Sequence, residues 1–521
     1  MKHNSLKATW LLSAILLILL ASSLIASLFF KEKWLWMDEV LSYVLISDAS
    51  DSHLKAALVS GMDANPPVFP NLYWLISHLI SLNPQFLRAV SVVLFAGTIA
   101  YFFVFVTRLL GTPRTNFVLI SLFTGLTYLN LTLSTQIRTY ALFLLIGLVY
   151  FIIIHRLITS PSRLKLLGLH ILVGTLLVFT HNFGLFYLAA SGAFFGLLWL
   201  WSRERSYLWV LSTYSLIGLL WFAIWYPSFS VQTLAGKPHS WIPLPTFLSF
   251  FRTVGELAPN LSSTLERSPG FEFLAVLRFL FILALFLYLS LPRLKDGFKA
   301  MIQDKAFGFF LLAGFIYFTT IAISLTVSFV HTSVFISRYL WPSHLLVIYQ
   351  LVYAFYQLTG ERRVTWLARL LPVYVVLLAL FVFYQNRKVV IFPSRVLSHL
   401  HQLDQRYPVL IESADYFLPI WFHHQVTHPR YLLDWETASV RDNILSATVE
   451  FNILTALREK YKVYNVITRQ GFNKVSMPHF YVIDETSHYQ IEHFLANGQV
   501  HIIRELPISI AGHRLLECRF D

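Results

Sequence analysis

The sequence predicts a polytopic α-helical membrane protein with about eleven transmembrane helices and a small extracytoplasmic α/β domain at its C-terminus. Of the 521 residues, 56% are hydrophobic and only 13% are charged, and the mean hydropathy is +0.61. Ordinary soluble domains carry roughly 25% charged residues. Helices that meet lipid around their whole circumference explain this composition better than several water-soluble cores.

The net charge of +13 does not indicate a nucleic-acid partner. The basic residues are dispersed in short clusters between apolar runs, where the anchors that flank membrane helices belong. The only cysteine is Cys518, which excludes an intramolecular disulfide and structural zinc of the cysteine-rich kind.

The first predicted span covers residues 8–30 and follows a short basic N-terminus. A signal peptide is the alternative, since Ala21, Ser22 and Ser23 are small. The apolar run is about 20 residues long, however, and signal-peptide cores are usually 7–15 residues, so we expect an uncleaved helix. The other predicted spans are 86–107, 117–133, 140–154, 166–179, 183–201, 207–226, 271–291, 307–329, 339–356 and 364–384.

Basic residues near the helix ends predict the orientation. If the N-terminus is cytoplasmic, every inner connection is basic, and the odd number of spans puts the tail outside. Lys31 and Lys33 oppose this orientation, because they would lie in the first outer connection. We expect the bacterial inner (plasma) membrane. The inner connections hold Arg108, Arg114, Arg156, Arg163, Lys165, Arg203, Arg205, Arg293, Lys295, Lys299, Lys305, Arg362 and Arg363.

Two domains follow from this layout. Residues 1–385 form the transmembrane domain with long outer loops at 31–85 and 227–270, and the apolar run 68–82 predicts a helix at the membrane surface. Residues 386–521 are richer in charge and histidine and form the predicted α/β domain. Its predicted strands are 408–412, 462–467, 479–484 and 514–519.

Asp38 and Glu39 are the sharpest chemical feature, directly after the first span on the outer side. The structural explanation is an acidic pair at the start of a surface helix, where the helix dipole favours it. The functional explanation is a carboxylate at the water–lipid boundary that takes a proton from a substrate hydroxyl. Both explanations are open at this point.

Other polar residues are expected at the same membrane face. Gln136, Arg138 and Tyr140 lie in a short outer connection, His181 lies at another, and Arg338 and Tyr339 begin a later span. A single arginine at an interface usually snorkels as an anchor. Outer arginines oppose the usual charge bias, however, and a guanidinium binds phosphate through two hydrogen bonds.

The order of these motifs resembles the GT-C superfamily of integral membrane glycosyltransferases, in particular the branch with protein O-mannosyltransferases and lipid A aminoarabinose transferases. The resemblance covers most of the chain, from Ala8 to Tyr384. The motifs that carry it are Asp38-Glu39 with Tyr43, Asn65-Pro66-Pro67-Val68-Phe69 with Arg88, Thr135-Gln136-Ile137-Arg138-Thr139-Tyr140, His181-Asn182-Phe183 and Arg338-Tyr339-Leu340.

This resemblance implies inverting transfer of a sugar from a polyprenyl-phosphate donor to a lipid, glycan or protein acceptor at the outer face. Asp38 would be the general base, with Glu39 beside it, and Arg138 would bind the donor phosphate, helped by Arg338 or His181. Relatives carry Glu where this chain has Gln136, which weakens the case for a divalent cation such as Mg²⁺ or Mn²⁺. Metal dependence therefore stays open.

A transporter or lipid-linked glycan flippase is the alternative function. Such proteins place ionisable residues near the bilayer midplane, whereas the predicted spans here are nearly free of charge. The tail histidines His423, His424 and His428 are expected to be solvated rather than zinc ligands, and the tail itself is expected to help recognise the acceptor or shield the site.

Overall fold

The computed structural model describes most of the chain. The described residues are 3–30, 34–235, 240–260, 271–297, 303–359, 371–389, 397, 400–440, 443–444, 446–485, 490–508, 510 and 512–521. They fall into two compact units. The first unit comprises residues 1–31, 83–225 and 244–389; the second comprises residues 32–82, 226–243 and 390–521.

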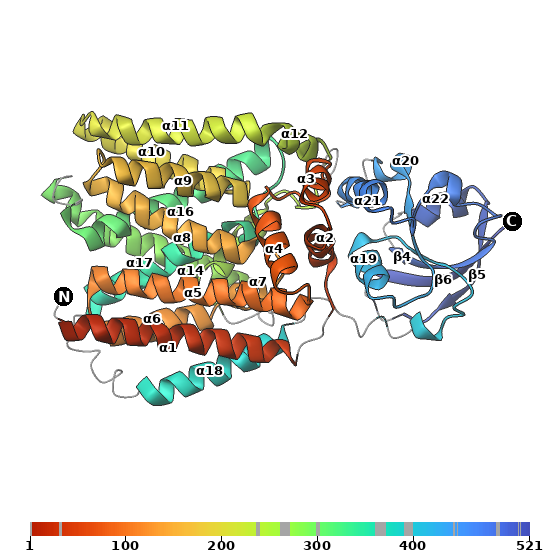
Figure 1. Cartoon of the computed structure of the whole chain (residues 1–521), viewed down its shortest axis with the longest axis horizontal. Coiled ribbons are helices and arrows are strands. Elements are labelled where there is room, and N and C mark those ends of the chain that lie inside the picture. Colours follow the sequence, from red (N-terminus) through yellow and green to blue (C-terminus); the bar gives the residue numbers. More distant parts are fainter. Residues whose placement is uncertain are drawn as a thin grey trace. The chain divides into compact units, whose positions relative to one another are not determined.

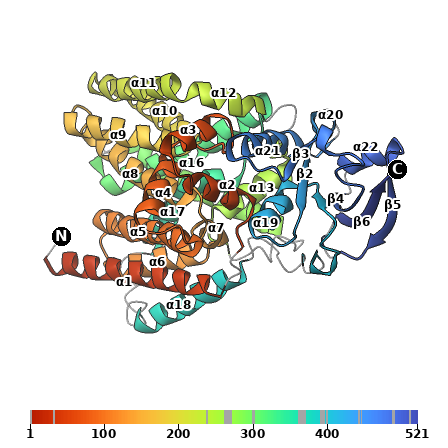
Figure 2. The same ribbon diagram turned by 45° about the vertical axis from the view of Figure 1, so that its right-hand side comes forward.

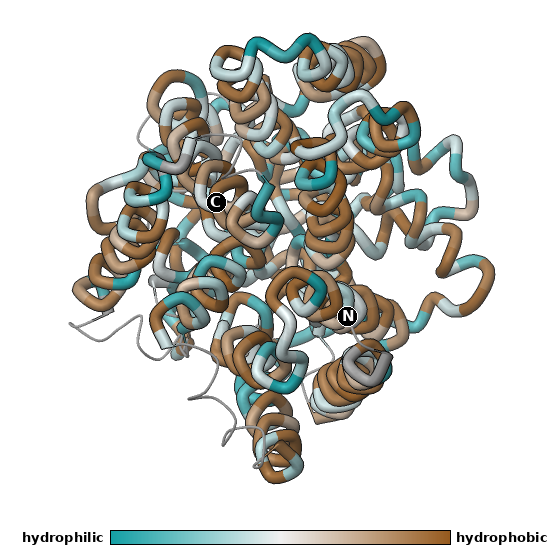
Figure 3. The backbone as a smooth tube through the Cα atoms, turned by 90° about the vertical axis from the view of Figure 1, so that its left-hand side faces the viewer, coloured by the Kyte–Doolittle hydropathy of each residue, from teal (hydrophilic) through white to brown (hydrophobic). Residues whose placement is uncertain are grey.

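The first unit is a bundle of helices, many of which run side by side (Figure 1). Apolar residues dominate these helices (Figure 3). Its elements are α1 (His3–Leu28), α5 (Pro84–Leu110), α6 (Pro113–Gly125), α7 (Tyr128–Leu133), α8 (Tyr140–Thr159), α9 (Leu164–Thr180), α10 (Gly184–Ser202), α11 (Ser206–Ile224), α13 (Phe247–Glu256), α14 (Phe271–Ser290), η1 (Pro292–Asp296), α16 (Lys305–Val330), η2 (Ser337–Leu340), α17 (Trp341–Thr359) and α18 (Leu371–Lys388).

Seven helices of the described residues are long and apolar enough to cross a membrane. Each coincides with a predicted span, and together they indicate a multi-pass integral membrane protein. They are Leu6–Leu28, Pro84–Leu110, Tyr140–Thr159, Gly184–Ser202, Ser206–Ile224, Glu272–Ser290 and Lys305–Val330.

The other four predicted spans stay predictions. The span 117–133 is divided between α6 and α7, because the backbone of Tyr128 donates a 2.9 Å hydrogen bond to the carbonyl of Asn260 instead of continuing the helix. The span 166–179 corresponds to α9, which has 17 residues. The span 339–356 begins in η2 and continues in α17, and residues 364–370 of the last span lie outside the described residues.

The second unit contains a six-stranded sheet in the order β3-β2-β1-β4-β6-β5. Strands β3, β2, β1 and β4 are parallel, while β6 is antiparallel to β4 and β5. The elements from the tail are β1 (Val409–Ile411), α19 (Ala414–Phe422), β2 (Pro429–Leu433), α20 (Trp435–Ala438), α21 (Ala447–Tyr461), β3 (Val466–Thr468), η6 (Arg469–Gly471), β4 (His479–Glu485), α22 (Gln490–Ala496), β5 (Val500–Leu506) and β6 (His513–Phe520).

Three predicted strands coincide with β1, β4 and β6, the fourth, 462–467, overlaps β3 only at residues 466–467, and the sequence missed two more. Strand β2 is almost wholly buried, so it lacks the alternation that marks a half-buried strand. Strand β5 lies at the edge of the sheet and is largely exposed. The core beneath the sheet contains Leu410, Leu432, Phe480, Val482 and Leu516.

The first outer loop folds as part of the second unit. It forms α2 (Met37–Ile46), α3 (Asp51–Val59) and α4 (Val68–Leu79), and α12 (Tyr226–Ala235) from the second outer loop joins them. The Tyr461 hydroxyl in α21 donates to Asp48 Oδ2 at 2.8 Å, and Gln232 Nε2 in α12 donates to the Asp63 carbonyl at 3.0 Å. Helices α2, α3 and α21 lie close together in both ribbon views (Figure 2).

Candidate functional site

Three turns of the first unit meet where the sequence places its candidate residues. They are the turn 136–139 before α8, the turn 181–183 between α9 and α10, and η2 before α17. The Thr139 hydroxyl donates to the Thr180 carbonyl at 2.9 Å. The His181 ring lies 4.9 Å from the Tyr339 ring and 6.0 Å from the Tyr140 ring.

The turn at His181 depends on Gly184. A Cβ atom at this position would lie 2.7 Å from the carbonyl oxygen of Leu177, closer than real side chains come. The glycine therefore lets α10 begin directly against the end of α9. This close approach holds His181 beneath α8 and η2.

Burial and two neighbouring charges decide the charge state of His181. Burial lowers the pKa of His181 to about 3, and the positive charges of Arg138 and Arg338 lower it further in the same direction. The imidazole is therefore neutral near pH 7 and supplies no positive charge to a phosphate. Its Nδ1 accepts a 3.1 Å hydrogen bond from the Phe183 N–H, so the proton resides on Nε2, which can donate.

The same electrostatics indicate that both arginines lie close to His181. Arg138 is buried, with 7% of its surface exposed, whereas Arg338 is half-buried and its guanidinium lies 5.7 Å from the ring of Tyr339. An anion placed among these groups would interact with two guanidinium charges, and the low dielectric would strengthen both interactions.

Gln136 lies in the same cluster but supplies no charge. It is 7% exposed, and its backbone carbonyl accepts a 2.7 Å hydrogen bond from the Ser91 hydroxyl in α5. Among the described residues, no group of three or more His, Cys, Asp or Glu side chains has the arrangement of a metal site.

A hydrogen-bond network that sequence reasoning missed holds η2 and α17. Trp341 Nε1 donates to Asn130 Oδ1 at 2.7 Å, and Asn130 Nδ2 lies 2.9 Å from His344 Nε2. His344 Nδ1 donates to the Leu257 carbonyl at 2.7 Å. Because these residues belong to no recognisable motif, only the fold reveals that they fasten α7, α13 and α17 together.

Glu256, at the end of α13, was also missed. Its carboxylate accepts a hydrogen bond from the hydroxyl of Ser337, the residue before Arg338. A carboxylate from the second outer loop thus fixes the backbone that carries a candidate phosphate ligand. The loop is rich in proline and aromatic residues, and nothing in its sequence distinguishes Glu256 from an ordinary surface acid.

Asp38 and Glu39 belong to the second unit, where they lie in the first turn of α2. Asp38 is half-buried and Glu39 is fully buried. Trp36 precedes the helix and makes no side-chain capping bond, so both carboxylates stabilise the helix start through its dipole. The structural explanation is therefore satisfied for this pair, and the catalytic one stays a prediction.

The tail domain holds the segment that leads into α2. His423 Nε2, at the end of α19, accepts a 2.9 Å hydrogen bond from the Leu35 N–H, and its ring lies 4.9 Å from that of Trp34. The expectation of a solvated His423 is therefore wrong, because the residue is partly buried in this contact. His424 and His428 are exposed.

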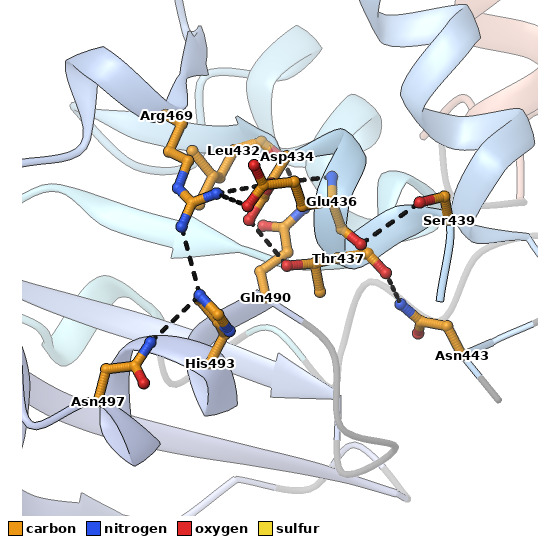
Figure 4. Close-up of polar contacts among 10 residues, drawn as sticks. All are labelled: Leu432, Asp434, Glu436, Thr437, Ser439, Asn443, Arg469, Gln490, His493 and Asn497. Carbon is orange, nitrogen blue, oxygen red and sulfur yellow. Dashed lines mark hydrogen bonds and ion pairs between the residues drawn. The ribbon is translucent and has the colours of Figure 1, made fainter. Parts of the chain in front are cut away.

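A second polar cluster lies at the carboxyl ends of β2 and β3 (Figure 4). Asp434 accepts a 2.7 Å hydrogen bond from the Thr437 hydroxyl, and Arg469 pairs with Glu436 and lies 3.3 Å from His493 Nε2. Each of these groups is engaged by another member of the cluster. The arrangement therefore fastens α20 and α22 to the sheet edge.

The crevice between β1 and β4, where parallel sheets with a reversal of strand order usually bind ligands, is filled by the chain itself. Glu412 accepts hydrogen bonds from the N–H groups of Ile491 at 2.5 Å and Glu485 at 3.1 Å. Burial and the charge of neighbouring Asp484 raise the pKa of Glu412 well above its usual value. We assign no ligand to this crevice.

No family model and no curated protein sequence matches the chain.

Proposed function

We propose that the chain is a membrane glycosyltransferase that moves a sugar from a polyprenyl-phosphate donor to a lipid, glycan or protein acceptor. The observation that supports it best is the meeting of Arg138 and Arg338 around neutral His181. Two guanidinium groups and an N–H donor suit a lipid-linked phosphate leaving group. The proposal includes eleven spans, an extracytoplasmic tail and the bacterial inner membrane.

The proposed reaction is a single inverting displacement at the anomeric carbon of the donor sugar. The bond from this carbon to the phosphate oxygen breaks while the bond to the acceptor oxygen forms, through an oxocarbenium-like state. Polyprenyl phosphate leaves with the bonding electrons. Asp38 takes the proton of the acceptor hydroxyl, and Arg138 and Arg338 stabilise the charge on the leaving phosphate.

Transfer by the purified full chain from a synthetic polyprenyl-phosphate sugar to added acceptor lipids and glycans tests the proposal. Asp38→Asn keeps the size and hydrogen bonding of the side chain but cannot take the proton, so the rate should fall about 10²–10⁴-fold. Glu39→Gln is the matched control and should cost less. Near-normal turnover by Asp38→Asn would exclude Asp38 as the general base. Loss of transfer in Glu39→Gln alone would identify Glu39 as the base instead.

The two arginines are tested by donor binding. Arg138→Ala should weaken binding about tenfold or more, since a charge-assisted hydrogen bond is worth roughly 1.5–3 kcal/mol. Arg138→Lys should restore only part of the affinity, because an ammonium group replaces a guanidinium that donates two hydrogen bonds to phosphate. Wild-type affinity in both variants would mean that Arg138 only anchors its helix at the membrane interface. Movement of the lipid-linked sugar across vesicles without transfer would instead indicate a flippase.

A further inference from the structure

A small cavity lies beside η2 in the first unit. Its volume is about 80 Å³, and it is lined by Tyr128, Leu129, Thr132, Glu256 and Asn260. Helix α7 supplies the first three residues, while Glu256 ends α13 and Asn260 follows it. Asn260 is held firmly, because its N–H donates to the Leu126 carbonyl at 2.6 Å and its carbonyl accepts from the Tyr128 N–H at 2.9 Å.

The cavity offers oxygen acceptors beside the donors of the Asn260 amide and the Tyr128 hydroxyl. Asn260 is only 5% exposed, and its Oδ1 atom has no hydrogen-bond partner among the described residues. The Thr132 hydroxyl already donates to the carbonyl of Leu129 at 3.0 Å, which leaves its oxygen able to accept. The Glu256 carboxylate completes the set. A buried acceptor without a donor costs roughly 1–3 kcal/mol, so a ligand that donates hydrogen bonds would relieve this cost.

The charges nearby distinguish between two kinds of ligand. Oxygen acceptors suit both divalent cations and hydroxyl groups. Glu256, however, binds Ser337, which directly precedes Arg338, and the charges of Arg338 and Arg138 both reach His181. The positive charge of Arg338, one residue from Ser337, opposes a divalent cation but leaves a neutral hydroxyl unaffected. The volume admits a few non-hydrogen atoms, since one water occupies about 30 Å³ in the liquid.

We infer that this cavity receives hydroxyl groups of the donor sugar, with Asn260 and Glu256 as their acceptors. The inference rests on the proposed function, because Arg338, one residue from the Ser337 that Glu256 holds, would bind the phosphate of the same donor. Glu256 then links recognition of the sugar to placement of the phosphate ligand. Asn260 and Glu256 become determinants of which sugar is accepted.

The test compares two lipids on the full chain in nanodiscs: a polyprenyl-phosphate hexose and bare polyprenyl phosphate. Asn260→Ala should weaken binding of the sugar-bearing lipid about tenfold and leave the bare lipid unchanged within about twofold. Glu256→Gln should do the same to a smaller extent, because the amide still accepts one hydrogen bond. Leu248→Ala, at an exposed position of α13, is the control and should change neither affinity.

A second arm varies the sugar instead of the protein and then combines the two changes. A series of singly deoxygenated donor sugars is bound to the wild-type chain, and one of them should lose about tenfold in affinity. Binding of that analogue should then be insensitive to Asn260→Ala, as a double-mutant cycle requires for interacting groups. Equal weakening of both lipids by Asn260→Ala, or no loss with any deoxy sugar, would overturn the cavity's role. If the wild type binds neither lipid, the proposed function itself fails.

Discussion

The imidazole of His181 is neutral because of where the chain places it. It is 6% exposed and lies among aromatic rings, with Phe143 at 4.9 Å on one side and Tyr339 at 4.9 Å on another. Two arginine charges add to the cost of protonation. The imidazole therefore stays neutral near pH 7 and keeps its proton on Nε2.

This arrangement makes stability depend on pH. An unfolded histidine takes up a proton near pH 6.5, whereas folded His181 does so only near pH 3. The contribution of His181 to stability is therefore complete above pH 6.5 and is lost as the pH falls, by up to about 1.4 kcal/mol per pH unit. His181→Asn should flatten the dependence of the unfolding free energy on pH between 7 and 5 by this amount.

Exposed His428 provides the control for this measurement. His428→Asn should leave the slope of the wild type unchanged. Equal slopes for the wild type and His181→Asn would show that His181 takes up its proton in the folded protein as easily as in the unfolded chain.

At this scale the sequence identified the residues of the arginine cluster but not their charge states. Arg138, His181 and Arg338 could be selected because outer arginines oppose the usual charge bias and because all three residues match motifs of the resembled family. The neutrality of His181 could not be predicted, because it depends on rings and charges from three separate turns. Glu256 and Asn260 could not be predicted either, since their partners are distant in the chain.

Among the elements, α2 and α19 form the contact with the clearest consequence. The N–H of buried Leu35 donates to His423 Nε2, and the rings of Tyr43 and Phe422 lie 5.2 Å apart. Helix α19 therefore fixes the start of the helix that carries Asp38.

Replacing His423 should loosen α2. His423→Leu leaves the Leu35 N–H without this acceptor, at a cost of about 1–3 kcal/mol, so hydrogen exchange in residues 37–46 should accelerate. His423→Gln offers another acceptor and should restore part of the protection. The exposed His428→Leu serves as the control. Unchanged exchange in His423→Leu would mean that α2 does not depend on this contact.

The α6–α7 break shows what hydropathy leaves out of one predicted span. Residues 117–133 are largely apolar, so composition alone predicts a continuous helix. The interruption at Leu126 and Thr127 arises because both sides of the break pair with Asn260, more than 120 positions along the chain. A pairing over such a separation leaves no trace in a local pattern.

For the whole molecule, eleven spans and the basic inner connections predict that the two ends of the chain lie on opposite sides of the membrane. A reporter fused after Arg203 should give a cytoplasmic signal, and one fused after Asp521 should give an extracytoplasmic signal. Signals from the same side at both positions would contradict the topology. Additional fusions between α5 and α8 would then locate the span that was miscounted.

The membrane class of the whole chain followed from composition, and the seven helices that are long and apolar enough to span a membrane lie where the apolar runs predict them. Composition did not predict that the outer loops group with the tail. The sequence predicts residues 31–85 as an outer loop of the transmembrane domain, whereas residues 32–82 belong to one compact unit with the tail. Hydropathy separates apolar from polar segments, and it carries no information on which polar segments fold together.

The discontinuous second unit has a consequence for biosynthesis. Its first segment ends at residue 82 and its last begins at residue 390, so about 300 residues are synthesised between them. At roughly 5–20 residues per second this takes about 15–60 s. Throughout that interval α2 lacks α19, so Tyr43 lacks the ring of Phe422 and the Leu35 N–H lacks its acceptor His423. A nascent chain that stalls before the tail is complete would therefore present these groups to chaperones and proteases.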